Sequence, residues 1–423
     1  MSEVVTVAGL GVAGDGIAVV AGERLFIPYA VPGDRLAVRR EGRRGEGWRA
    51  RIVERLADGP DRAPPSCRHF GTCGGCALQH LAEPAYRAWK QRRATDAVAR
   101  HGLDPAIVAP LVPTVPGDRR RIRLAARRIA AGLVLGFNAA ESHRIIEIAE
   151  CPVAAPALAV LLPGLRRGLT PLWPAGAEGE VALTLTDAGV DVLVILPAPL
   201  DAAARTALAA LAEALDLARL SVARGPAATP EPVVERRSPT VRFGTVDVVP
   251  PPAGFLQAGR AAERTLVGLV TDAVPADARV ADLFAGCGTF SLALAGRARR
   301  VRAVDRDGPA LDALATAARR AGLAGRVAVE RRDLDRRPLG PAELADCDTV
   351  ILDPPRAGAA AQAEALARSR AACVVYVSCN PATFARDAAH LAGGGLRAER
   401  VTPVDQFLWS PHVELVAVFR RSA

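Results

Sequence analysis

Lysine and methionine are almost absent from this sequence. Of the 54 basic residues only Lys90 is a lysine, and Met1 is the only methionine among 423 residues. Such a bias is typical of a genome rich in arginine and alanine codons, so abundant arginine by itself indicates little about function. The positive charge still stands: the formal net charge is +9 and the isoelectric point about 9.6, as is typical of proteins that bind a polyanion.

The sequence also lacks a secretory signal and a membrane-spanning segment. Residues 1–16 contain no basic stretch followed by an apolar one, and no run approaches the ~18 apolar residues of a membrane helix. These absences predict a soluble, cytoplasmic protein with no membrane partner, in a compartment where thiols stay reduced. Clustered cysteines are therefore interpreted as metal ligands or catalytic groups rather than disulfides.

Three of the eight cysteines lie close together, at Cys67, Cys73 and Cys76. Their spacing indicates a metal site, for which four thiolates would suit zinc and an iron–sulfur cluster about equally. Three other cysteines have the apolar or turn-like contexts of buried structural cysteines: Cys287, Cys347 and Cys373.

A chain of this length is expected to contain two or three domains. We predict a small β-barrel over residues 1–56, because short β-type runs alternate there with glycine and proline turns. Residues 9–14 match G-x-G-x-x-G, but a strand pattern follows instead of a helix, so we interpret these glycines as turn residues. Residues 57–250 mix helical and β-type runs, including a helix from about 83 to 100, and prolines at 250–252 mark the next boundary.

In residues 251–423, strands alternate with helical stretches. The β-type runs span residues 279–284, 301–305, 327–331, 349–353 and 374–378. This alternation predicts an α/β fold with a parallel, doubly wound, Rossmann-like sheet. Ligands bind such sheets beyond the carboxyl ends of the strands, so the residues that follow these runs are candidates for a binding site.

The sequence DLFAGCGTF at 282–290 lies where the first of these strands turns into a helix. Its glycines let a ligand approach the backbone closely, and Asp305 ends the next strand, where the fold offers a carboxylate to a ribose hydroxyl. The third glycine of the dinucleotide pattern is missing, so S-adenosylmethionine is favoured over NAD. Asp333, after the third strand, fits an adenine edge and a solvated loop equally well.

Two further strand ends carry reactive groups. Asp353 is followed by two prolines, which hold its carboxylate toward the same crevice. Cys379 precedes a helix that begins at Pro381, and the helix dipole would favour its thiolate. Cys379 is thus a candidate nucleophile, with a buried, inert cysteine as the alternative. Glu414 precedes an apolar run and, taken alone, would be a solvated carboxylate.

Together these residues resemble the uridine-5 RNA methyltransferase family. The motifs that carry the resemblance are GFLQ at 254–257, DLFAGCGTF at 282–290, DPPRAG at 353–358, SCNPATFARD at 378–387 and HVE at 412–414. Residues 1–56 resemble a TRAM domain, a small RNA-binding β-barrel. The resemblance implies catalysis by Cys379 and Glu414, and cofactor contacts from Gln257, Phe284, Gly286, Thr289, Asp305, Asp333 and Asp353.

The resemblance also implies an iron–sulfur centre. One branch of the family has C-x5-C-G-G-C followed by a distant Cys-Pro, and holds a [4Fe–4S] cluster on the residues that match Cys67, Cys73, Cys76 and Cys151. Radical S-adenosylmethionine enzymes use a different spacing, C-x3-C-x2-C. The cluster branch implies a uridine of 23S ribosomal RNA as substrate, because the transfer-RNA branch in bacteria typically lacks these cysteines.

The implied mechanism is covalent. Cys379 adds to carbon-6 of uracil, carbon-5 then takes the methyl group, and Glu414 removes the carbon-5 proton. Gln257 and Asp353 would hold the uracil edge and the methyl donor in line, and the target base must leave its stack. The chain departs from the family pattern at several cofactor contacts and in residues 407–412, so the RNA target stays open.

Several alternatives also stay open. Four arginines on one face of a predicted strand would either contact an RNA backbone or form a solvated face: Arg119, Arg121, Arg123 and Arg127. The same chemistry on transfer RNA, methylation of another substrate, and a non-catalytic RNA-binding module that keeps S-adenosylmethionine are the alternative functions. The presence of both Cys379 and Glu414 disfavours the last two. We expect a monomer.

Overall fold

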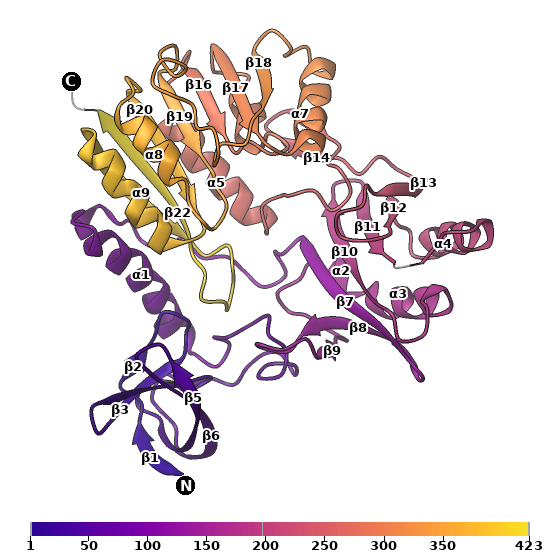
Figure 1. The fold of residues 1–423 in the computed structure, drawn as a ribbon, viewed down its shortest axis with the longest axis vertical. Helices are drawn as coiled ribbons and strands as arrows, with labels where there is room; N and C mark the ends of the chain where they lie inside the picture. The colour runs from indigo at the N-terminus through magenta and orange to yellow at the C-terminus, as the bar shows by residue number, and fades with distance from the viewer. Residues whose placement is uncertain (1, 197, 422–423) are drawn as a thin grey trace.

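The computed structural model describes residues 2–196 and 198–421, so Met1 and residues 422–423 of the predicted terminal domains lie outside the described residues. The described strands form three large sheets and one hairpin. Figure 1 shows the N-terminal sheet at the bottom, the central sheet at the right and the C-terminal sheet at the top. None of the described helices combines the length and apolar character that crossing a membrane requires.

The N-terminal sheet curls around a small core of its own. Its order is β1-β5-β6-β4-β3-β2, with bounds β1 Glu3–Thr6, β2 Gly9–Leu10, β3 Gly16–Val20, β4 Glu23–Ile27, β5 Arg35–Arg44 and β6 Gly47–Ala57. Only residues 7–8 separate the two edge strands β1 and β2, so one bent segment joins both edges of the sheet. Alternate residues such as Leu25 and Ile27 of β4 are fully buried, as the period of a strand requires.

The predicted helix after the cysteine cluster is confirmed as α1 (Glu83–Arg100). Pro84 stands in its first turn, where the missing N–H breaks no hydrogen bond, and Glu83 favours the positive end of the helix dipole. The helix packs against α9 (Pro381–Gly393) of the C-terminal part. It therefore connects the N-terminal and C-terminal parts of the molecule, as Figure 1 shows.

The central part is a seven-stranded sheet in the order β13-β12-β11-β10-β7-β8-β9. Its strands are β7 Arg121–Ile129, β8 Gly132–Asn138, β9 Ile145–Glu147, β10 Glu178–Thr186, β11 Gly189–Ile195, β12 Arg219–Ala223 and β13 Glu231–Glu235. The helices of this part are α2 Pro156–Ala159, α3 Leu162–Leu169 and α4 Ala202–Ala214, and two 3-10 turns span Pro105–Ile107 and Thr170–Leu172. Leucines of α3 and α4 pack in one core with the valines of β11.

The C-terminal part confirms the predicted doubly wound α/β fold. After the hairpin β14 Val241–Phe243 and β15 Val246–Val248, the sheet runs β18-β17-β16-β19-β20-β22-β21. Its strands are β16 Arg279–Leu283, β17 Arg300–Asp305, β18 Val327–Arg331, β19 Thr349–Leu352, β20 Cys373–Ser378, β21 Leu396–Val404 and β22 Glu414–Arg421. The other helices are α5 Arg260–Ala273, α6 Thr289–Leu294, α7 Gly308–Arg320 and α8 Ala360–Ala367. The first five strands are parallel and β22 is antiparallel to its neighbours.

The strand order places the binding crevice. From β16 the chain moves outward through β17 and β18, and then returns to the other side of β16 as β19. The order therefore reverses between β16 and β19, and a doubly wound sheet opens a crevice at this switch point.

Several strands were not predicted from the sequence: β2, β8, β9, β12, β13, β14, β15 and β21. β13 has no fully buried residue and β14 and β15 are three residues long, so their patterns are too short or too polar to detect. β21 carries exposed charged residues in its first half and is fixed as a strand by its pairing with β22.

Candidate active site and cysteine cavity

A cavity of about 470 Å³ lies at the switch point of the C-terminal sheet. Its wall includes the predicted residues Gln257, Phe284, Gly286, Asp305, Asp333, Asp353, Cys379 and Glu414. Residues separated by more than one hundred positions in the sequence thus meet around one space, because the carboxyl ends of parallel strands share one edge of the sheet.

The glycine-rich turn after β16 forms one wall of this cavity. Phe284, Gly286 and Gly288 all adopt a left-handed backbone, with φ of 64°, 53° and 91°. A Cβ atom on Gly288 would lie 2.4 Å from Cδ1 of Leu314, whereas one on Gly286 would meet nothing within 4 Å. Gly288 is therefore required for packing, and Gly286 for its φ and for the open space that it leaves.

Two of the predicted cofactor contacts have defined positions beside this turn. Asp305 accepts hydrogen bonds from the backbone N–H groups of Gly286 (2.8 Å) and Asp307 (2.8 Å), which fix its carboxylate at the cavity. Thr289 does not line the cavity. It is the first residue of α6, beyond the two left-handed glycines, so the turn separates it from the wall that Phe284 and Gly286 form.

Four side chains form a hydrogen-bonded chain across the floor of the cavity. Nε2 of Gln406 donates to Oε2 of Glu414 (2.8 Å) and to Oε1 of Gln257 (2.9 Å). Nε2 of Gln257 in turn donates to Oδ2 of Asp353 (2.8 Å). The two amides therefore hold the two carboxyl groups in place at the opposite ends of the chain.

Gln406 was not predicted from the sequence. It lies two residues after β21, whose last residue Val404 is paired with Glu414 at the start of β22. Only this pairing brings Gln406 beside Glu414. Gln406 could therefore have been found from the sequence only if β21 and its pairing with β22 had been predicted.

The carboxyl groups of the cavity have raised pKa values. Burial raises the pKa of Glu414, which is 2% exposed, to about 7, and the hydrogen bond from Gln406 partly offsets this effect. The pKa of Asp353 is raised by burial and then by the charge of Glu414. Glu414 is therefore close to half-ionised near neutral pH, which is the condition that favours a general base.

The shift of the Cys379 pKa is opposite to the predicted one. Burial, and then the charges of Glu414 and Asp353, raise it to about 12, while Arg356 has a lowering effect. From the sequence, the N-terminus of α9 was expected to stabilise a thiolate. Instead Asn380 is the N-cap and its side chain accepts from the N–H of Ala382 (3.2 Å), so Cys379 stands outside the helix beside two acids.

Arg121 and Phe255 also line this cavity. The guanidinium group of Arg121 lies 5.3 Å from the centre of the Phe255 ring and donates to the carbonyl oxygen of Leu256 (2.8 Å). Phe255 is 62% exposed, although it is a large apolar residue beside a cavity. Phe255 belongs to the GFLQ motif, but no role was predicted for it from the sequence.

The other arginines of this segment have different environments. Arg123 pairs with Glu180 (2.6 Å) and Arg127 with Glu178 (3.6 Å) on the exposed face of the central sheet. Arg119 precedes β7 and is half-buried. The predicted row of four equivalent guanidinium groups is therefore not formed.

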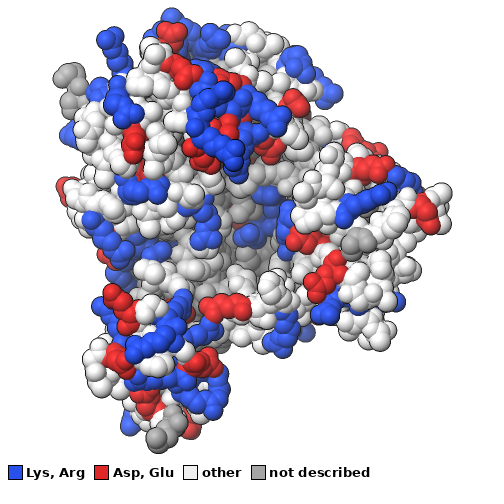
Figure 2. All heavy atoms as spheres, viewed as in Figure 1, with Lys and Arg blue, Asp and Glu red and all other residues white. Residues whose placement is uncertain are grey.

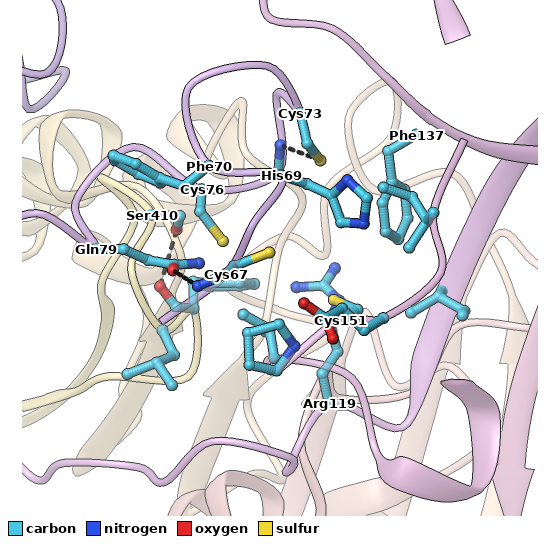
Figure 3. Close-up of a pocket in the computed structure, with 18 of the residues that line it drawn as sticks. Cys67, His69, Phe70, Cys73, Cys76, Gln79, Arg119, Phe137, Cys151 and Ser410 are labelled. Atoms are coloured by element: carbon cyan, nitrogen blue, oxygen red, sulfur yellow. Dashed lines mark hydrogen bonds between the residues drawn. The ribbon is translucent and has the colours of Figure 1, made fainter. Parts of the chain in front are cut away.

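The four predicted metal ligands surround a second cavity of about 300 Å³. Cys67, Cys73 and Cys76 come from the loop before α1, and Cys151 comes from the segment between β9 and α2. Figure 3 shows the four cysteines around one space, with Cys151 on the side opposite Cys73. The N–H of Gly74 donates to the carbonyl oxygen of Asn138 (2.9 Å) and so anchors the loop to β8.

The thiols of this second cavity have few protein partners. Burial raises the pKa of Cys67 and Cys73, and raises that of Cys76 to about 12, with the neighbouring thiols adding to the effect. Cys73 accepts one hydrogen bond, from the N–H of Gly75 (3.4 Å). Among the described residues, no group of three or more His, Cys, Asp or Glu side chains is arranged to hold a metal ion. The four thiols share one cavity, but they are not arranged as a metal site.

The two cavities share a wall. Arg119 and Phe407 line both of them, and the segment that contains Phe407 continues along the cysteine cavity with Leu408 and Ser410.

Three features are typical of methyltransferases of the S-adenosylmethionine-dependent class. They are the doubly wound sheet, the left-handed glycine turn after β16, and the carboxylate of Asp305 at the end of β17. Residues 328–422 match the family model described as tRNA (uracil-5-)-methyltransferase. The chain is 44% identical to an RNA methyltransferase of Brucella suis, over 99% of this chain and 97% of that protein.

A second relative has a stated target. The chain is 37% identical to the 23S rRNA (uracil(1939)-C(5))-methyltransferase RlmD of Chromohalobacter salexigens, over 95% of this chain and 85% of that protein. The chain therefore belongs to the RNA uracil-C5 methyltransferase family, as an enzyme that uses S-adenosylmethionine.

A solved structure has the same fold. The tRNA (uracil-54, C5)-methyltransferase of Pyrococcus abyssi, in complex with S-adenosyl-L-homocysteine, superposes with a TM-score of 0.75 at 24% identity and covers 98% of this chain and 99% of its own.

Proposed function

We propose that this enzyme methylates carbon-5 of a uridine in 23S ribosomal RNA through a covalent bond between Cys379 and the uracil. One observation carries the proposal: the thiol of Cys379 and the buried carboxyl of Glu414 line one cavity, and the charge of Glu414 acts directly on the thiol. A nucleophile and a base that face one space are what an addition followed by a proton removal requires.

The proposed reaction has three covalent changes. The thiol of Cys379 loses its proton to solvent, the thiolate forms a bond to carbon-6, and the electron pair moves to carbon-5. Carbon-5 then takes the methyl group of S-adenosylmethionine, whose bond from that methyl group to sulfur breaks and leaves a neutral thioether. Finally Glu414 removes the carbon-5 proton, the pair re-forms the ring double bond, and the carbon–sulfur bond breaks to release the thiolate. A positioned base contributes roughly 10²–10⁴-fold to such a step.

The cavity wall offers groups for the uracil and for the methyl donor. Gln257 and Asp353 present a linked amide and carboxyl, which can pair with the edge of a uracil. The exposed ring of Phe255, with Arg121 beside it, gives a flat surface on which a flipped base can stack. Gly286, Asp305 and Asp333 line the same cavity together with Phe284, and the cofactor would bind against them.

We further propose that Cys67, Cys73, Cys76 and Cys151 hold a [4Fe–4S] cluster. Four cysteines that line one cavity can supply the four thiolates that a [4Fe–4S] cluster takes, one on each iron. Four thiolates would also suit zinc, and the resemblance of their spacing to the cluster-bearing branch of the family favours the cluster. The cluster would supply positive iron centres that compensate the four thiolates.

The choice of ribosomal RNA rests on two supports. One is the stated target of the relative from Chromohalobacter salexigens. The other is the set of four cysteines, which the bacterial transfer-RNA branch typically lacks. We propose 1–56 as a TRAM-like RNA-binding domain, 57–250 as a cluster-binding domain and 251–423 as the methyltransferase domain. Figure 2 shows basic side chains over the N-terminal sheet and on both sides of a hollow between the three parts.

The experiment uses two variants and a trap. Cys379→Ala is expected to abolish both methyl transfer and any covalent bond to RNA. Glu414→Gln is expected to accumulate a methylated, covalent RNA adduct that survives denaturing electrophoresis, because elimination stalls. RNA with 5-fluorouridine should trap the wild type, since fluorine does not leave as a proton does.

Cys347→Ala is the matched control, because Cys347 is half-buried and does not line the cavity. An adduct with Cys379→Ala would assign the nucleophile to another residue. Wild-type turnover by Glu414→Gln without an adduct would exclude Glu414 as the base. Mapping 5-methyluridine in a deletion strain decides between ribosomal and transfer RNA.

A further inference from the structure

Residues 405–412, here called the 405–412 segment, touch both cavities. Gln406 and Phe407 line the catalytic cavity, and Phe407, Leu408 and Ser410 line the cysteine cavity. The segment joins β21 to β22 and so leads directly into Glu414. Any displacement of the segment would move Gln406, whose amide holds Glu414.

The ammonium group of Lys90 is the anchor of this segment. Lys90 lies on α1 and is fully buried. Its Nζ donates to Oδ1 of Asp405 (2.8 Å), to the carbonyl oxygen of Phe407 (3.2 Å) and to the carbonyl oxygen of His412. One side chain thus ties both ends and the middle of the segment to α1.

Other groups hold the segment in the same place. The hydroxyl of Tyr86, also on α1, donates to Oδ2 of Asp405 (2.6 Å) and accepts from the N–H of Trp409 (2.8 Å). The carbonyl oxygen of Trp409 accepts from the N–H groups of Ala77 (2.8 Å) and Leu78 (3.0 Å), directly after Cys76. Trp409 has a left-handed φ of 56°, a strained conformation that only surrounding contacts maintain.

The presence of lysine at this position has a physical reason. The chain uses arginine at every other basic position except histidines. An ammonium group has three donors around one compact centre, whereas a guanidinium group is a planar fork on a larger frame. Three oxygen acceptors converge on Nζ of Lys90, which matches the ammonium group in number and shape.

We propose that Lys90 is a positioning residue for the carbon-5 proton removal: it fixes the 405–412 segment so that Gln406 holds Glu414 toward the uracil. This inference rests on the proposed role of Glu414 as the base. Lys90 does not itself line the cavity and reaches its wall only through the backbone carbonyl of Phe407, so the addition of the thiolate and the methyl transfer do not depend on it directly.

The test measures release of the covalent adduct. Lys90→Met is expected to slow adduct release roughly 10²-fold, the scale of a misplacement of about 1 Å, while the KM for S-adenosylmethionine stays unchanged. Lys90→Arg keeps the charge but not the compact three-donor centre, and is expected to show the same release defect. A role of charge alone would be rescued by arginine, so rescue by Lys90→Arg would overturn the proposal.

Two further variants keep the test decisive. Arg87→Met is the matched control, because Arg87 lies on α1 in an exposed pair with Glu83, and it should release RNA at the wild-type rate. Lys90→Met leaves the buried carboxylate of Asp405 without its ion-pair partner and with only the hydrogen bond from Tyr86, which is strongly destabilising. The double variant Lys90→Met/Asp405→Asn removes both charges, and should fold while it still accumulates adduct.

The outcomes separate this inference from the proposed function. If Glu414→Gln accumulates adduct but a folded Lys90→Met or double variant releases RNA at the wild-type rate, the positioning role is wrong and the function stands. If Glu414→Gln accumulates none, the proposed role of Glu414 is wrong, and with it the basis of the inference.

Discussion

The catalytic cavity and the cysteine cavity share a wall but differ in what satisfies their polar groups. In the catalytic cavity, Gln406 and Gln257 join Glu414 to Asp353 through hydrogen bonds of 2.8–2.9 Å. In the cysteine cavity, Cys73 accepts a single long hydrogen bond from a backbone N–H. Hydrogen bonds within the protein therefore fix the polar side chains of the catalytic cavity. In the cysteine cavity, a bound group would have to fix the positions of the thiols.

This difference predicts opposite sensitivities. Hydrogen-bonded side chains hold a base in place before the substrate arrives, which is the condition for efficient proton transfer. Thiols with raised pKa values hold protons and repel one another when charged, so a metal centre must displace those protons when it binds. Substitutions in the first cavity should alter rates and pH dependence, and substitutions in the second should alter metal content.

The largest effect is expected for iron. Anaerobically prepared wild type should be brown and contain about four irons per chain, a count that follows from a cluster with four thiolate ligands. Cys76→Ser and Cys151→Ser should lose the cluster, because serine is a poor ligand for these irons. Iron analysis and visible absorption measure the loss, with Cys347→Ser as control. Stoichiometric zinc without iron in fresh wild type would contradict the cluster.

The second largest effect is expected in the catalytic cavity, where Gln406 donates a hydrogen bond to Glu414. Gln406→Ala removes the hydrogen bond that lowers the pKa of Glu414, so that pKa should rise above about 7. The base acts as a carboxylate, and the acidic limb of the kcat profile should therefore move to higher pH, with kcat at pH 7 reduced by roughly 5-fold for a one-unit rise of that pKa.

The matched control is Gln362→Ala, because Gln362 is an equally buried glutamine whose amide bonds the backbone of Leu339 outside the cavity. It should destabilise the fold without moving the pH profile. An unmoved acidic limb in Gln406→Ala would show that the amide does not tune Glu414.

The third effect concerns stability. The pKa of Glu414 is about 7 in the folded state against an ordinary value of 4.5, so between these pH values the folded state binds more protons than the unfolded state. The stability contributed by Glu414 is therefore greatest below pH 4.5 and is lost as pH rises through 7. Glu414→Gln should raise the free energy of unfolding by about 2.5 kcal/mol more at pH 8 than at pH 5.

Urea unfolding at the two pH values measures this difference. Glu364→Gln, an exposed carboxylate on α8, should show almost none of it. If Glu414→Gln raised the free energy of unfolding equally at both pH values, burial would not perturb the pKa of this carboxyl group.

The smallest effect is expected at Arg123. Its guanidinium group already pairs with Glu180, so Arg123→Ala should change the salt slope of RNA binding by less than the roughly 0.7–0.9 unit of one lost phosphate contact. Arg121→Ala should instead lower kcat/KM, because Arg121 faces the catalytic cavity. A full unit of slope lost with Arg123→Ala would assign that residue to the RNA backbone.

Particular residues show where predictions from the sequence differ from the structure. Thr289 was assigned to the cofactor site because it follows the glycine motif. It is the first residue of α6 and is not among the residues that line the cavity, and its contact with the cofactor stays a prediction. The pKa of Cys379 was expected to fall because a helix follows it. Burial, and then the charges of Glu414 and Asp353, raise this pKa instead, and no local pattern in the sequence contains either effect.

The sequence by itself determined the doubly wound sheet, the helix α1, and which strand ends and cysteines could carry chemistry. These features follow from local rules: the period of strands and helices, the turn residues between them and the spacing of motifs. Only the tertiary structure decided that Gln406 joins Glu414 to Gln257, that Lys90 anchors the 405–412 segment, and that the two cavities share a wall. Hydrogen bonds, burial and charge depend on distances between segments far apart in the chain, and those distances exist only once the sheets have packed.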